Sequence, residues 1–257
     1  MSKRKRFVLT SLILALGFFV LQFINIQNYK FMGIGILGFL TLILFIWSLR
    51  EGLGKNPTLL TLILPVAFTI SVGFFWFLLP TSWLSRIPVI IIFGLGIYAL
   101  SLTSNIYTVA AIRTIALFRA ARGVGFLLTL VTMFLIFDTV ISLRTNILLT
   151  SLLVFISSFF LYLQGFWVVT LDERFTKRLF VKTLISAFMM GEYAACMYFW
   201  PVTVVVGSLF LTVVAYVLLG LGQARLEGRL FNQTVREYLV VGAVVFIVML
   251  FSTHWGG

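Results

Sequence analysis

The chain has 257 residues, of which 61% are hydrophobic and 10% are charged, and its mean hydropathy is +1.15. Soluble proteins carry about 25% charged residues, so a soluble fold is excluded, and repeated apolar runs of about 18 or more residues predict helices that cross a bilayer. The net charge of +12 does not indicate nucleic-acid binding, because the basic residues fall in short connections between the apolar runs.

The apolar runs predict an all-α, polytopic transmembrane bundle of about nine spans. We expect residues 1–257 to form a single integral membrane domain, in which a basic connector, residues 105–122, separates the fourth span from the fifth. The predicted spans are residues 7–25, 31–49, 58–79, 87–104, 123–143, 146–169, 183–200, 203–222 and 238–254.

The distribution of Lys and Arg predicts the orientation. With the N-terminus in the cytoplasm, the connections on the inner side hold 16 of the 19 basic residues. Positive charge is retained on the cytoplasmic side of membrane proteins. We therefore expect a cytoplasmic N-terminus, an external C-terminus and a bacterial-type cytoplasmic membrane. The three basic residues left outside are Lys30, Arg86 and Arg144.

The connector, NIYTVAAIRTIALFRAAR, carries Arg113, Arg119 and Arg122. On a helix lying in the membrane interface, these guanidinium groups can hold the phosphates of anionic lipids. In the other interpretation, the fourth span is longer than predicted and ends in a basic segment that remains in the cytoplasm. The polar positions do not form one clean helical face, which favours the second interpretation.

The third and seventh spans resemble one another. The third begins KNPTLLTLIL and the seventh begins VKTLISAFMM, and both end in aromatic residues followed by proline. Spans 1–4 and 5–8 are therefore candidates for parallel repeats of the kind that some transporters contain. The similarity also follows from the ordinary composition of membrane helices, and the sequence leaves both explanations open.

Two carboxylates fall inside predicted spans: Glu192 near the middle of the seventh, and Asp138 in the outer third of the fifth. Because an ionised carboxylate costs several kcal/mol at the centre of a bilayer, such residues are candidates for function. A desolvated carboxyl can load and release a proton near neutral pH. Structural roles compete with this one: Glu192 hydrogen-bonded to a neighbouring helix, and Asp138 paired with Arg144.

Enzymatic and metal-dependent functions lack the residues they need. The chain has one cysteine, Cys196, and one histidine, His254, so it cannot supply a Cys/His zinc cluster or an intramembrane two-histidine metal motif. No serine elbow of the G-x-S-x-G type is present. We therefore expect no enzyme activity, no metal and no cofactor.

Two functions remain. The first is a small proton-coupled permease in which Glu192, with Asp138, lines a polar cavity. The second is a non-catalytic membrane-embedded subunit, scaffold or assembly factor whose helix faces bind partner helices or a second copy of the chain. The expected partners are the bilayer, anionic lipid and other membrane proteins, and no nucleic acid.

Overall fold

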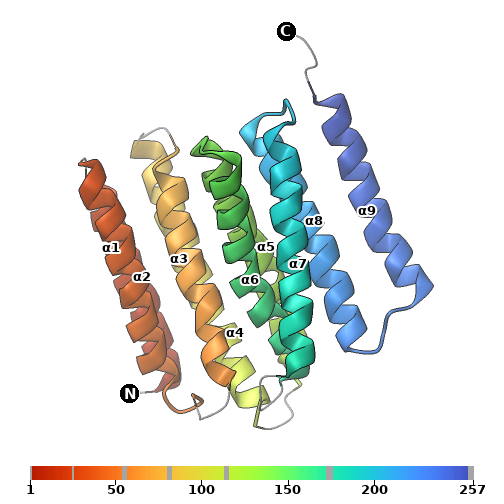
Figure 1. The fold of residues 1–257 in the computed structure, drawn as a ribbon. Coiled ribbons are helices and arrows are strands. Elements are labelled where there is room, and N and C mark those ends of the chain that lie inside the picture. Colours follow the sequence, from red (N-terminus) through yellow and green to blue (C-terminus); the bar gives the residue numbers. More distant parts are fainter. Residues whose placement is uncertain are drawn as a thin grey trace. The chain divides into compact units, whose positions relative to one another are not determined.

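The structure, a computed structural model, describes residues 2–24, 26–53, 57–79, 83–112, 116–171 and 176–253. Within these ranges the chain is helical and contains no strand, which confirms the predicted fold class (Figure 1). The helices are α1 (Lys3–Leu21), α2 (Gln27–Leu49), the 3₁₀ helix η1 (Pro57–Leu62), α3 (Ile63–Trp76), α4 (Trp83–Ala110), α5 (Phe118–Ser142), α6 (Ile147–Thr170), α7 (Lys177–Tyr198), α8 (Val204–Leu226) and α9 (Asn232–Phe251).

Eight helical stretches in the described ranges are long and apolar enough to cross a membrane, and the first of them is α2. The first predicted span, residues 7–25, corresponds to α1, which is not one of these eight stretches. Four basic residues open this helix, so its apolar part runs only from Phe7 to Leu21. At 1.5 Å per residue this part is about 22 Å long, shorter than the hydrocarbon core of about 30 Å.

Residues 1–128 and 129–257 form two compact units, and the division falls inside α5. In the first unit, α1 packs against α2 and α4, and α2 packs against α3. The core of this unit is aromatic: the ring of Phe18 lies 4.8 Å from that of Phe93 and 6.3 Å from that of Trp76, and all three side chains are buried. A hydrogen bond of 3.0 Å from Thr41 to Thr69 joins α2 to α3.

Proline explains the change from η1 to α3. Pro65 has no backbone N–H, so it cannot donate the α-helical bond to the carbonyl of Thr61, four residues earlier. The hydroxyl of Ser104 on α4 donates to that carbonyl instead, at 3.5 Å. The lost helical bond is thus replaced by a bond between helices.

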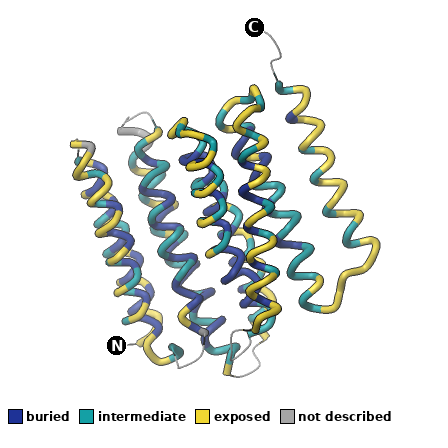
Figure 2. The backbone as a smooth tube through the Cα atoms, viewed as in Figure 1, coloured by how far each residue is buried: buried dark blue, intermediate teal, exposed yellow. Residues whose placement is uncertain are grey.

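In the second unit, α6 and α7 pack along one another, α8 packs against both, and α9 packs against α8. Polar side chains tie these helices: the buried Tyr162 hydroxyl donates to the carbonyl of Ala215 at 3.5 Å, and the half-buried Gln223 amide donates to that of Gly165 at 2.9 Å. Along α9 only Met249 is buried, and Figure 2 shows the rest of this helix as intermediate or exposed. Large apolar surface on the outside of a helix is expected where lipid is the solvent.

Candidate functional site

The inward face of α7 is made of small and medium-sized residues. Thr183, Ala187, Met190 and Ala194 recur at helical spacing and are buried. A Cβ atom added to Gly191 would lie 3.3 Å from the Cβ of Phe155 and 3.4 Å from the carbonyl oxygen of Ser151, both on α6. Glycine therefore allows α7 to approach α6 closely, and this packing determines which residues α7 turns outward.

The outward face of α7 forms a stripe along its length, which we call the α7 stripe. Its members repeat three or four residues apart, so they share one side of the helix. All are exposed; Phe188 is 60% exposed. The α7 stripe consists of Leu184, Ile185, Phe188, Glu192, Cys196 and Phe199.

Glu192 is the only charged member of the α7 stripe. It lies ten residues beyond Lys182, or about 15 Å along the helix axis, half the thickness of a hydrocarbon core. No described residue forms a hydrogen bond or an ion pair with its carboxyl group. The carboxyl therefore sits on an apolar face of α7, six residues before the helix ends at Tyr198, and has no partner within the described part of the chain.

Asp138 has the opposite setting. Its side chain is buried, and its Oδ1 atom accepts a hydrogen bond of 3.1 Å from the hydroxyl of Ser208, which is fully buried on α8. The expected ion pair with Arg144 does not form; Arg144 is exposed at the end of α5. A serine three helices further along the chain binds Asp138 in place of the arginine, and no local spacing predicts such a contact between residues 70 positions apart.

A cavity of about 560 Å³ lies in the second unit, where α5, α6, α7 and α8 end or begin. Among the described residues that line it, Arg144 alone is charged; its φ of 46° is left-handed and unusual for a residue other than glycine. Neither Asp138 nor Glu192 lines it. Glu192 is two residues from a lining residue, Ala194, and so points about 200° away around the helix. The lining residues are Ile141, Arg144, Thr145, Thr150, Ala194, Met197, Tyr198, Trp200, Val202, Thr203, Val204 and Gly207.

The structure describes residues 105–112 and 116–122 of the predicted connector 105–122. Residues up to Ala110 belong to α4 and residues from Phe118 belong to α5, which agrees with the interpretation that the fourth span runs long. Arg113 lies outside the described residues. Arg119 is exposed, and the guanidinium of Arg122 lies 5.7 Å from the Phe118 ring. Binding of lipid by these three arginines stays a prediction.

A hydrogen bond joins the end of α4 to the start of α5. The hydroxyl of Tyr107 on α4 donates to the carbonyl of Ala121 on α5 at 2.9 Å. A Cβ atom at Gly125 would lie 1.9 Å from this hydroxyl. Glycine at this position thus leaves room for the tyrosine, and the pair packs the end of α4 against the start of α5.

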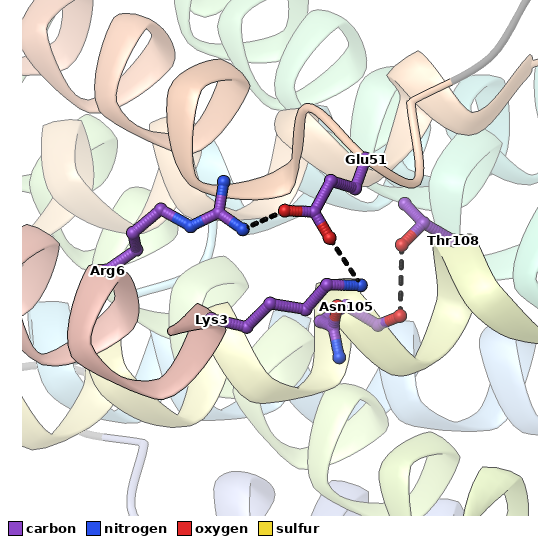
Figure 3. A network of polar contacts seen from close by, with 5 residues as sticks. All are labelled: Lys3, Arg6, Glu51, Asn105 and Thr108. Atoms are coloured by element: carbon purple, nitrogen blue, oxygen red, sulfur yellow. Dashed lines mark hydrogen bonds and ion pairs between the residues drawn. The ribbon is translucent and has the colours of Figure 1, made fainter. Parts of the chain in front are cut away.

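A polar cluster that the sequence predictions missed lies in the first unit (Figure 3). Glu51, just after α2, pairs with Lys3 at 3.0 Å and with Arg6, both on α1. Hydrogen bonds from Lys3 and then Arg6 lower the pKa of the Glu51 carboxyl below its ordinary value of 4.5. The cluster joins the start of α1 to the end of α2. One signal was available: Glu51 is the only acidic residue before Asp138.

The fold defines a multi-pass integral membrane protein. Residues 51–252 match the model of the family described as "Protein of unknown function (DUF5656)", and the chain belongs to this family. The match begins at Glu51, so α1 and α2 precede it. Neither a curated protein nor a solved structure matches the chain.

Proposed function

We propose that this protein is a non-catalytic, membrane-embedded subunit that binds another transmembrane helix through the α7 stripe. The observation that carries the proposal is the position of Glu192, a carboxyl group on an exposed apolar helix face that has no partner among the described residues. On insertion scales an acidic side chain at the centre of a helix costs about 3 kcal/mol. A partner helix that supplies a hydrogen bond removes much of this penalty.

A second copy of the chain is the first partner to test. Two copies inserted in the same orientation carry Glu192 at the same depth, and a two-fold axis along the membrane normal brings identical residues together. Two carboxyl groups in contact share or exchange protons and satisfy one another by hydrogen bonds. The apolar members of the α7 stripe, such as Phe188 on one side of Glu192 and Phe199 on the other, would pack around them.

Counting protein copies in bilayers tests the proposal. Single-molecule photobleaching should show complexes for the parent protein and for Glu192→Gln, whose amide still forms hydrogen bonds, and should show mostly monomers for Glu192→Leu. Glu237→Gln is the matched control, because this carboxyl lies near the start of α9 and already accepts a hydrogen bond from Gln233. The proposal is contradicted if the parent protein is monomeric, with no other protein bound, at every dilution.

A second function, proton-coupled transport, rests on a different observation. The cavity at the helix ends has a volume suited to a small solute, and Asp138 lies one helical turn below its lining residue Ile141. In this version Asp138, not Glu192, carries the proton, and Arg144 attracts anionic solutes. Solute uptake into vesicles driven by a pH gradient should then be lost in Asp138→Asn and retained in Glu192→Gln. Equal uptake by parent and Asp138→Asn rejects it.

A further inference from the structure

A groove of about 450 Å³ runs along the surface of the first unit between α1 and α4. It is basic at one end and apolar along its length. Five of its residues come from the first turns of α1, and the sixth is an aromatic residue of α4. The lining residues are Arg4, Lys5, Val8, Leu9, Leu12 and Tyr98.

The charges at the start of α1 divide between two faces of the helix. Lys3 and Arg6 bind Glu51 on one face (Figure 3). Arg4 and Lys5 face the groove, are exposed, and have no acidic partner among the described residues. Two adjacent positive charges are therefore available to a ligand, while Glu51 neutralises part of the charge of their neighbours.

The apolar part of the groove continues from these charges in the direction of the membrane. Val8, Leu9 and Leu12 follow Arg4 and Lys5 on the same side of α1 and are 43%, 39% and 58% exposed. Leu12 lies about 12 Å along the helix axis from Arg4. Cations at the level of the headgroups, followed by a lipid-exposed apolar strip, match the two parts of a phospholipid.

We propose that this groove binds an anionic phospholipid of the predicted cytoplasmic leaflet. The lipid phosphate accepts charge-assisted hydrogen bonds from Arg4 and Lys5. A zwitterionic lipid binds these residues more weakly, because the cation of its headgroup repels them. One acyl chain lies over Val8, Leu9 and Leu12, and the ring of Tyr98 closes the side of the groove. The site is distinct from the predicted lipid contacts at Arg113, Arg119 and Arg122 and does not depend on the α7 stripe.

Lipid retention measured by native mass spectrometry tests this site. The parent protein, reconstituted with equal amounts of phosphatidylglycerol and phosphatidylcholine, should retain the anionic lipid preferentially. Each basic residue near a membrane surface contributes about 1 kcal/mol, so Arg4→Gln with Lys5→Gln should weaken phosphatidylglycerol binding about thirtyfold. A matched control, Arg229→Gln with Arg236→Gln, removes the same charge from the second unit and should leave this binding unchanged.

Two further measurements keep the test decisive. Both double variants should keep the parent's thermal unfolding midpoint, because neither alters Glu51 or its partners, and the pair of the exposed Arg229 with Glu227, at 3.9 Å, contributes little to stability. A lipid-depleted sample of parent protein should not bind inorganic phosphate alone with comparable affinity. Equal retention of phosphatidylglycerol in the parent and the Arg4/Lys5 variant, an equal loss in the Arg229/Arg236 control, or displacement of lipid by inorganic phosphate would each overturn the proposal.

Discussion

Replacement of Glu192 by leucine should weaken assembly without harming the fold. At the centre of a membrane helix, insertion scales assign about 3 kcal/mol to an acidic residue and about −0.5 kcal/mol to leucine. In the monomer, where the Glu192 side chain is exposed, this exchange should therefore stabilise the inserted helix. In the assembly, the variant loses hydrogen bonds worth about 0.6 to 1.7 kcal/mol each.

Both changes act in the same direction on association. Leucine has no insertion penalty in the monomer, so assembly no longer relieves one. Leucine also cannot form the hydrogen bonds that Glu192 forms in the assembly. If each copy contributes one hydrogen bond, association should weaken by at least about 1.2 kcal/mol, about eightfold, with the monomer penalty of about 3 kcal/mol as the upper bound. The assay is energy transfer between labelled copies, titrated against the protein-to-lipid ratio, with Glu192→Gln as the hydrogen-bonding control. Association of Glu192→Leu as strong as that of the parent refutes the reasoning.

Three other predictions follow from contacts within each unit. Gly125→Ala should destabilise the first unit by about 1–3 kcal/mol through overpacking against the Tyr107 hydroxyl, and Tyr107→Phe should restore part of the loss in thermal unfolding of the double variant. The lowered pKa of Glu51 means that its contribution to stability is present at neutral pH and is lost as the pH falls below about 4.5; Glu51→Gln should remove this pH dependence. Ser208→Ala should cost about 1–3 kcal/mol, measured by chemical unfolding, because buried Asp138 loses its donor. A parent-like unfolding curve for any of these variants contradicts the corresponding contact.

Helix positions were predictable because membrane spans are defined by the solvent. Long apolar runs end where Arg, Lys or Pro begins, and eight of the stretches found this way have the length and composition of spans. The start of the first helix was harder to interpret, because its four basic residues continue the helix instead of preceding it. An α-helix satisfies its own backbone and can extend past the hydrocarbon core into the headgroup region.

The orientation of the two intramembrane acids was not predictable. Asp138 and Glu192 are both single carboxylates among apolar neighbours, yet the first is buried against Ser208 and the second is exposed. In a bilayer, lipid is as apolar as the protein interior, so hydrophobicity does not distinguish the two sides of a helix. Contacts between helices make this distinction, and those depend on small residues such as Gly191 whose partners lie far away in the sequence.

The connector shows a different limit. Its arginines suggested a segment between spans, whereas α4 continues to Ala110 and α5 begins at Phe118, with Tyr107 fitting against Gly125. A glycine and a tyrosine 18 positions apart carry no periodic signal. By contrast, the scarcity of acidic residues in the first half of the chain could have identified Glu51 as a partner for the basic N-terminus, because no other carboxylate precedes Asp138.

The most direct test of the account uses the chain's only cysteine. Cys196 lies one helical turn from Glu192 on the α7 stripe and is exposed. A nitroxide attached to Cys196 in bilayers reports collisions with oxygen, which dissolves in lipid, and with a nickel complex, which stays in water. If a partner helix covers the stripe, the label should be protected from both. Frequent collisions with oxygen would show a bare, lipid-facing helix, and frequent collisions with nickel would show a water-filled path; either result would contradict the proposed assembly.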